Sequence, residues 1–296
     1  MKAKIRTAFV LLVIIAGVFW GHVREAAGFA IPVPSAPGTD AKNNSKSVID
    51  YSNAKDGYVM VKFAQKTSKA IRAIVKGPSG DPYTYVVSPG NFEVFPFSKG
   101  NGEYTIGVYE QTTGTKYATA NTATVRVRLT SEFAPFLTPN QYVNYNKDNL
   151  TVKKAAEIVM GSSGLIGMIS AIYNFIINHI SYDEVLARNV QSGYLPNVDA
   201  ILRSGKGICF DYSVVMAAML RSLGIPCSLE VGYSGRSYHA WISTFSKETG
   251  TVNNVIRFDG KSWTLMDPTF ASSGKQSPEI MKFIGDGSNY KTKFRY

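Results

Sequence analysis

The sequence predicts two structural units in series, an all-β sandwich followed by an α+β domain. Between residues 47 and 130, short runs of alternating apolar and polar residues are separated by turn residues, which is the pattern of antiparallel strands. After residue 150 the apolar residues recur at helical spacing, and strand-like runs follow the helices. Helices that precede antiparallel strands are typical of an α+β domain. The length of 296 residues is sufficient for two domains.

The first thirty residues have the pattern of a secretory signal peptide. Lys2, Lys4 and Arg6 precede an uncharged run from residue 7 to residue 20, and small residues at 26–30 offer a cleavage site. The uncharged run is shorter than the ~20 residues that a membrane-spanning helix needs. We therefore expect a cleaved signal and a secreted or cell-surface protein, with a membrane contact only if the signal stays uncleaved.

The charge pattern argues against a nucleic-acid partner. The net charge is +11, and removal of residues 1–30 would lower it to about +8. The remaining Lys and Arg residues are dispersed rather than clustered, as on an ordinary solvated surface. Three histidines and two cysteines are too few for a His-rich or Cys-rich metal site, and no acidic cluster suggests calcium. We expect neither a metal nor another cofactor.

The N-terminal half is expected to hold a linker and a β module. Residues 31–46 are rich in Pro, Ser and Asn and are expected to be the linker. About seven short strands within 47–130 resemble an immunoglobulin-like β-sandwich. Strands are expected at 57–64, 70–76, 83–87, 92–97, 103–110 and 123–129. Because this region contains neither Cys nor His, we expect it to be an accessory module rather than a catalytic one.

Residues 131–296 are expected to form the second domain, with its core at 150–270. Helices are expected at 151–160, 165–180, 199–203 and 209–223. The last of them ends at Gly224-Ile-Pro226, where the glycine can cap the helix and the proline cannot continue it. Strands are expected at 228–233, 239–245, 255–258 and 262–267.

One cysteine is placed for nucleophilic chemistry. Cys209 is expected in the first turn of its helix, directly after Gly205-Lys-Gly207, where unpaired N–H groups and the positive end of the helix dipole favour a thiolate. A thiol nucleophile needs a base, and the base needs a group that orients it. His239 and Asp267 can supply both roles if their strands pair. The order Cys, His, Asp is that of a papain-like triad.

These residues and their neighbours resemble the core of the transglutaminase-like superfamily. The resemblance rests on five segments in order, GKGICFDY at 205–212, LRSLGIP at 220–226, VGY at 231–233, HAW at 239–241 and WTLMDPT at 263–269. It covers roughly residues 150–270 and implies a papain-like α+β fold. It also implies that Cys209 is the nucleophile, His239 the general base and acid, and Asp267 the residue that orients His239.

The reaction that the resemblance implies is acyl transfer from an amide. The Cys209 thiolate attacks an amide carbonyl, and water or an amine then resolves the thioester. We expect the backbone N–H of Cys209 to be one oxyanion donor, with Tyr182 as a candidate for the second. The expected substrate is a protein or peptide, such as a cell-wall peptide. Hydrolysis and transfer both stay open, as does a surface adhesion or scaffold protein that uses an inactive core for binding.

Other conspicuous residues are expected to be structural. A helix of some 14 residues would separate Cys227 from Cys209 by about 20 Å, whereas a disulfide needs Cα atoms within about 7 Å. Cys227 is therefore expected in the core. Roles in packing or capping are also expected for Asp211 as a helix cap, His179 as a structural residue, and Trp241 and Trp263 as packing residues around the triad.

Overall fold

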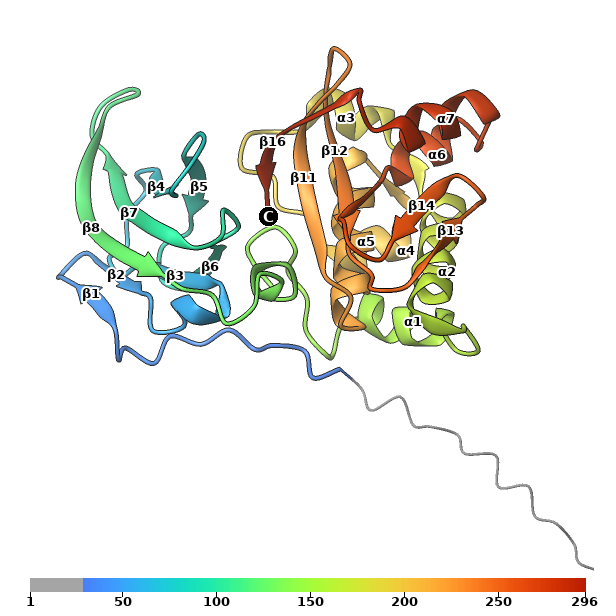
Figure 1. Ribbon diagram of the computed structural model, residues 1–296. Coiled ribbons are helices and arrows are strands. Elements are labelled where there is room, and N and C mark those ends of the chain that lie inside the picture. Colours follow the sequence, from blue (N-terminus) through green and yellow to red (C-terminus); the bar gives the residue numbers. More distant parts are fainter. Residues whose placement is uncertain (1–28) are drawn as a thin grey trace, which may run out of the picture.

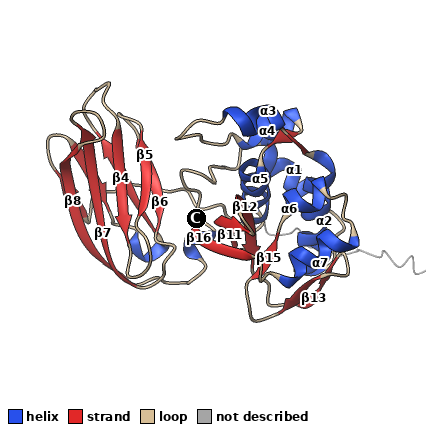
Figure 2. Cartoon of the chain, turned by 90° about the horizontal axis from the view of Figure 1, so that it is seen from above, coloured by secondary structure: helices blue, strands red, loops and turns tan. Residues whose placement is uncertain are grey.

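The computed structural model describes residues 29–296, so the expected signal peptide at 1–30 lies almost wholly outside the described residues. No helix within 29–296 is long and apolar enough to cross a membrane. The chain forms a β unit and a mixed unit that lie side by side, and the segment that follows the last strand of the β unit leads into the mixed unit (Figure 1). Seen from above, the strands of the β unit lie on one side of the molecule and the helices of the mixed unit on the other (Figure 2).

The β unit consists of two antiparallel four-stranded sheets. The first has the order β1-β2-β3-β6, with β1 (Ala41–Asn43), β2 (Ser47–Asp50), β3 (Tyr58–Phe63) and β6 (Phe92–Pro96). The second has the order β5-β4-β7-β8, with β4 (Ile71–Lys76), β5 (Tyr83–Val87), β7 (Gly102–Gln111) and β8 (Tyr117–Val127). Burial alternates along β4 and β5, where the buried residues are Ile71, Ala73 and Val75, and Tyr83, Tyr85 and Val87. Period-two burial of this kind is what two sheets packed on a shared core require.

Two strands of this unit, the first and the last, extend the sequence prediction. β1 lies inside the segment that was expected to be linker, and β8 begins six residues before the expected strand. Long-range hydrogen bonds hold β1: the side-chain amide of the buried Asn121 donates to the carbonyls of Lys42 and Ser47. The polar composition of residues 31–46 gives no local sign of such a contact. The specifically immunoglobulin-like assignment remains a prediction.

The mixed unit is built around one enclosed helix. Its helices are α1 (Leu150–Ile158), α2 (Gly164–His179), α3 (Glu184–Asn189), α4 (Val198–Ser204), α5 (Cys209–Ser222), α6 (Pro268–Ser273) and α7 (Pro278–Asp286). Every residue of α5 from Asp211 to Ser222 is buried, as expected of a helix that other elements surround on all sides. At its C-terminal end, the buried Arg221 donates to the backbone carbonyls of Thr138, Cys227 and Tyr296. The segment between the units and the last residue of the chain are thereby tied to α5.

A four-stranded sheet packs against α5. Its order is β15-β12-β11-β16, with β11 (Cys227–Ser234), β12 (Ser237–Thr244), β15 (Thr264–Met266) and β16 (Tyr290–Arg295). Two short pairs lie outside it, β9 (Ser181–Tyr182) with β10 (Lys206–Gly207), and β13 (Thr249–Val252) with β14 (Ile256–Asp259). The expected strand at 255–258 therefore belongs to a separate hairpin, and β12 pairs directly with β15.

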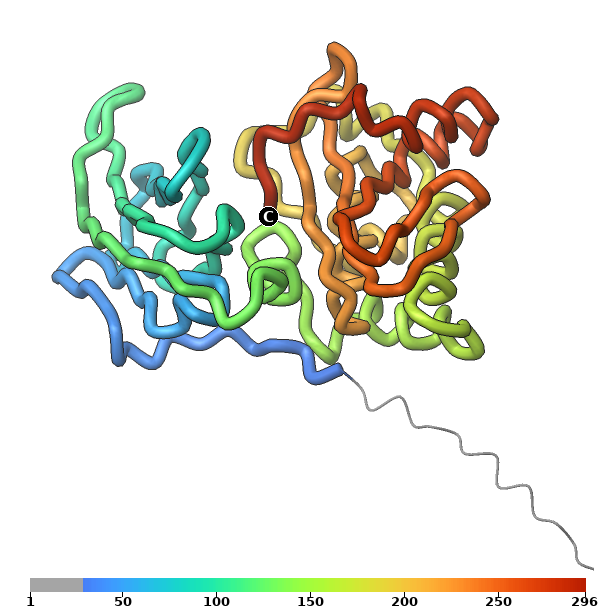
Figure 3. Tube along the Cα trace, viewed as in Figure 1, coloured from blue at the N-terminus to red at the C-terminus, as the bar shows by residue number. Residues whose placement is uncertain are grey.

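The end of β16 joins the two units. The tube representation shows the chain end lying between the β unit and the sheet of the mixed unit (Figure 3). The Tyr296 ring lies 5.4 Å from the ring of Tyr83 and 6.0 Å from that of Tyr85, both in β5. The Arg295 N–H donates to the Tyr83 hydroxyl at 3.2 Å. Aromatic packing across this junction fixes the position of β16 relative to both units.

Candidate active site

The N-terminus of α5 places Cys209 next to a tight turn. A Cβ atom on Gly207 would lie 2.6 Å from the Cβ of Asp211, so this approach requires glycine. The buried Asp211 carboxylate accepts from the Ile208 N–H at 2.9 Å and from the Tyr194 hydroxyl at 2.8 Å. Burial raises the pKa of Asp211, and these two hydrogen bonds oppose the rise. Asp211 thus caps the start of the helix, as expected, and leaves Cys209 at its first position.

His239 lies near the start of β12 and is held on two sides. Its Nε2 is 2.8 Å from Oδ2 of Asp267. The ring of Phe270 stacks on the imidazole with centroids 4.3 Å apart and planes inclined by 13°. The imidazole is buried, and the ring of Trp241 lies nearby with centroids 6.2 Å apart. This packing fixes the ring orientation before any substrate arrives.

Asp267 is fully buried, and both of its carboxylate oxygens are used. The pairing of β12 with β15, which sets Ile242 opposite Met266, brings the end of β15 alongside His239. Oδ1 accepts from the Phe270 N–H at 2.9 Å, which makes Asp267 the cap of α6. Oδ2 accepts from the Tyr290 hydroxyl at 2.8 Å and faces His239. A carboxylate fixed in this way can orient an imidazole and stabilise its positive charge.

The surroundings of His239 favour its protonated form. Burial lowers the pKa of His239, but hydrogen bonds and charge interactions with Asp267 and Cys209 outweigh burial and raise it to about 9. The imidazole therefore carries a proton at neutral pH. An imidazolium can stabilise a neighbouring thiolate and later donate its proton to a leaving amine.

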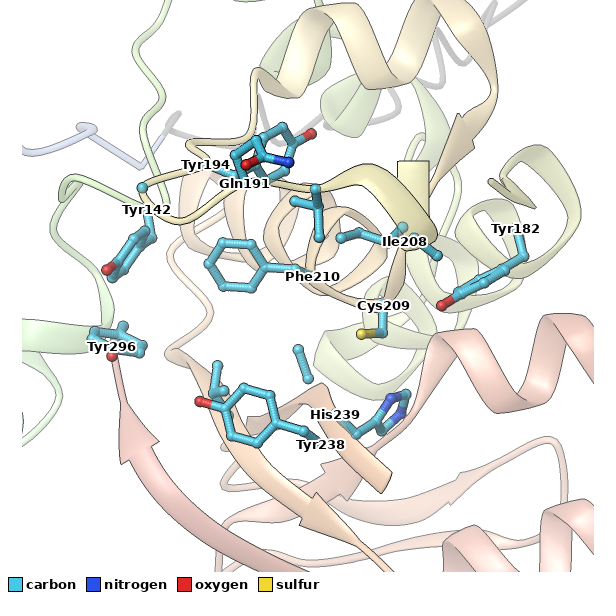
Figure 4. Close-up of a pocket in the computed structure, with 15 residues that line it drawn as sticks. Tyr142, Tyr182, Gln191, Tyr194, Ile208, Cys209, Phe210, Tyr238, His239 and Tyr296 are labelled. Carbon is cyan, nitrogen blue, oxygen red and sulfur yellow. The ribbon is translucent and has the colours of Figure 1, made fainter. Parts of the chain in front are cut away.

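A cavity of about 400 Å³ opens at Cys209 and His239. Figure 4 shows both side chains at one end of it, with the sulfur of Cys209 directed into the cavity and the hydroxyl of Tyr182 directed toward Cys209. Tyr182 is 38% exposed. Burial and the neighbouring Cys209 raise its pKa, so the phenol stays protonated and can act as a donor. Among the described residues that line the cavity there is no Lys, Arg, Asp or Glu.

The residues that the sequence singled out divide into two groups. Cys209, His239 and Tyr182 line the cavity, and the fully buried Asp267 contacts His239 from behind it. Cys227 lies apart as a buried free cysteine whose pKa burial raises to about 12.

The expected structural residues are confirmed with one exception. His179 contacts the Leu202 carbonyl through Nε2 at 2.7 Å, and the buried Trp241 packs on Tyr290. The exception is Trp263, which lies away from the triad. Its ring packs against Phe136 at 5.1 Å and lies under the Arg295 guanidinium, at the junction between the two units.

Sequence reasoning missed the aromatic residues around the triad. Tyr290 and Phe270 contact Asp267 and His239, and the Tyr173 hydroxyl donates to the Asp267 carbonyl at 3.4 Å. The only signal in the sequence was an aromatic content of 12%, which does not say where the rings lie. Within residues 29–296 no group of three or more His, Cys, Asp or Glu side chains could hold a metal ion.

Comparisons with known proteins identify the core. Residues 152–268 match the family model of the transglutaminase-like superfamily. None of the curated proteins matches the chain by sequence.

Several solved structures are similar at low identity. A TGase is 21% identical, with 40% of this chain and 30% of that chain covered and a TM-score of 0.31. The periplasmic domain of TgpA from Pseudomonas aeruginosa, bound to ethylmercury, is 15% identical, with 81% and 100% covered and a TM-score of 0.35. Red sea bream transglutaminase is 10% identical, with 71% and 47% covered and a TM-score of 0.33. The chain thus spans less than half the length of the two transglutaminase structures.

Proposed function

Residues 152–268 belong to the transglutaminase-like superfamily, and on that basis we propose that the chain is a cysteine enzyme that attacks amide carbonyl groups with Cys209. One observation carries the proposal. Cys209 and His239 line the same cavity, and His239 is fixed by a buried carboxylate 2.8 Å from its Nε2. These positions support Cys209 as nucleophile, His239 as base and Asp267 as orienting residue in acyl transfer through a thioester.

The chemistry follows from these positions. The Cys209 thiolate attacks the amide carbon, and the carbonyl oxygen becomes an oxyanion. The first residue of a helix has an N–H without an intrahelical partner, so the Cys209 N–H is one donor to this oxyanion, and the Tyr182 hydroxyl is our candidate for the second. His239 gives its proton to the leaving amine as the C–N bond breaks. The thioester then passes its acyl group to water or to an amine, with His239 taking the proton of the attacking molecule.

The substrate and setting belong to the same proposal. We propose a protein or peptide substrate, including cell-wall peptides, and an exported enzyme, because residues 2–20 have the pattern of a signal sequence. The strand orders β1-β2-β3-β6 and β5-β4-β7-β8 support an immunoglobulin-like accessory module in the β unit.

An inactive core used for surface adhesion is the alternative function. In such a protein, we would expect the Cys209 sulfur and the His239 imidazole to lie apart, with no cavity between them. The cavity that Cys209 and His239 share, and the pairing of His239 with Asp267, support the enzyme instead.

Labelling with a fluorescent iodoacetamide tests the nucleophile. We expect the folded wild type to be labelled at Cys209, Cys209→Ala to lose the label, and His239→Ala to react more slowly, because the imidazolium no longer stabilises the thiolate. Cys227→Ala is the matched control and should label like the wild type, since Cys227 is buried. An unreactive folded wild type, or labelling that survives Cys209→Ala, contradicts the proposal.

Incubation with a glutamine-containing peptide and a labelled amine separates the two outcomes of the thioester. Incorporation of the amine into the peptide indicates transfer, and release of free acid indicates hydrolysis. Both products must disappear in Cys209→Ala.

A further inference from the structure

The cavity at Cys209 extends well beyond the atoms that react. In Figure 4 it runs from the sulfur past the ring of Phe210, and Tyr142 and Tyr296 stand at the opposite end from His239. Tyr238 forms one side of this space. A volume of about 400 Å³ leaves room for a large side chain next to the nucleophile.

The walls of this extension are mainly aromatic and carry no charged side chain, with Val190 and the amide of Gln191 beside the rings. Burial, with smaller contributions from Tyr238 and Glu93, raises the pKa of Tyr142 to about 12, and burial also raises the pKa of Tyr296. Both phenols therefore stay neutral at any physiological pH. A charged side chain that entered the cavity would lose water without gaining a counter-ion, whereas an aromatic ring would meet ring faces and edges.

The far wall is held in place before substrate binds. The ring of Tyr142 meets the ring of Phe210 edge-on at 5.4 Å and the ring of Tyr296 at 4.7 Å. Tyr296 in turn packs edge-on against Tyr83 of the β unit at 5.4 Å. The β unit thus supports one end of the cavity. The shape of the cavity is therefore set by the folded protein before a substrate binds.

The position of His239 indicates which half of a substrate the cavity receives. Phe270 covers one face of the imidazole, and Asp267 occupies its Nε2 edge. The cavity lies on the other side of the sulfur from His239, toward Phe210. A carbonyl carbon placed at the sulfur therefore directs its acyl part into the cavity, while the leaving amine lies toward His239, which protonates it.

We propose that this cavity binds the side chain of the residue that contributes the attacked carbonyl, and that it selects a large, uncharged, aromatic side chain. The proposal rests on the proposed function of Cys209. It assigns the choice of substrate side chain to Tyr142, Phe210, Tyr238 and Tyr296. Cys209, His239 and Asp267 do not determine that choice.

Peptidyl chloromethyl ketones that differ only in the residue next to the ketone test this selection. The Cys209 thiolate displaces chloride from each of them, so the second-order rate of alkylation reports binding next to the sulfur. We expect the Phe compound to react about 10-fold faster than the Ala compound, and the Glu and Lys compounds to react more slowly than Ala. Each rate is divided by the rate with iodoacetamide, which is too small to use the cavity.

Three variants at two cavity positions locate the effect. Tyr238 is 59% exposed, so Tyr238→Ala should fold normally and still lower the ratio of Phe to Ala rates several-fold. Tyr142→Phe, which keeps the ring, should retain the ratio, and Tyr142→Ala should lower it. Tyr117→Ala, in β8 and away from the cavity, is the matched control.

The outcomes separate this inference from the function on which it rests. Normal iodoacetamide labelling with equal rates for Phe, Ala, Glu and Lys compounds overturns the specificity alone, as does faster reaction of a charged compound. Failure of iodoacetamide to label Cys209 overturns the nucleophile and the specificity with it.

Discussion

The Tyr290 hydroxyl donates a hydrogen bond to Oδ2 of Asp267 at 2.8 Å, and the same oxygen lies 2.8 Å from Nε2 of His239. A residue of β16 therefore acts on the imidazole through the carboxylate. Tyr290 lies beyond the segment 152–268 that matches the superfamily. Because it touches neither Cys209 nor the cavity, we regard it as a positioning residue.

The pKa of about 9 for His239 predicts where activity is lost at high pH. The imidazolium must donate a proton to the leaving amine, so amide turnover should be retained below this pKa and fall as the pH rises through about 9. The pH dependence of kcat/KM with a peptide amide measures this fall in activity, the alkaline limb of the pH profile. A limb near pH 6.5, the ordinary value for histidine, would show that Asp267 and Cys209 do not stabilise the charged ring.

Tyr290→Phe should move that limb to higher pH. Loss of the hydroxyl leaves more negative charge on the Asp267 oxygen that faces His239, and this charge favours the imidazolium. We also expect a loss of about 0.5–1.5 kcal/mol in the free energy of unfolding, as for one hydrogen bond. Tyr117→Phe in β8 is the control. If Tyr290→Phe lowers the rate of amide turnover but leaves the alkaline limb at the same pH, the role of Tyr290 is purely structural.

Gly232→Ala should disturb the site through β16. An added Cβ would lie 2.1 Å from the Lys291 carbonyl oxygen and 2.9 Å from the Lys293 nitrogen, so β16 would have to shift and carry Tyr290 and Tyr296 with it. We expect a loss of about 1–3 kcal/mol in stability, measured by urea unfolding, together with a lower rate of amide turnover. Gly167→Ala in α2 is the matched control, because its Cβ would have no neighbour closer than 3.7 Å. Equal behaviour of the two variants would contradict the packing argument.

Local signals were sufficient to predict the start of α5 and the positions of β11 and β12. A glycine turn before Cys209 and the Gly-Ile-Pro stop after the helix are short-range features. The approach of His239 to Asp267 was expected only on condition that their strands pair. The structure supplies that pairing, because β13 and β14 form a hairpin of their own and leave β15 free to join β12.

The aromatic part of the site could not be predicted in this way. Tyr142, Phe210, Tyr238 and Tyr296 come from four separate segments, and only the tertiary fold brings them together. The strand β16 was not expected at all, because its Lys and Arg residues alternate with others over only six positions at the chain end. Its pairing with β11 is a long-range contact, and the two tyrosines at its ends become site residues only through that pairing.

Direct detection of a covalent intermediate tests the central claim, that Cys209 carries the acyl group of the substrate. A peptide p-nitrophenyl ester that ends in Phe is mixed with the Cys227→Ala variant, quenched in acid within one turnover and digested for mass spectrometry. We expect the mass of the acyl group on the fragment that contains Cys209, its removal by hydroxylamine, and its absence in Cys209→Ala. Product release by the folded protein with an acyl group on another residue, or with none on Cys209, would contradict it.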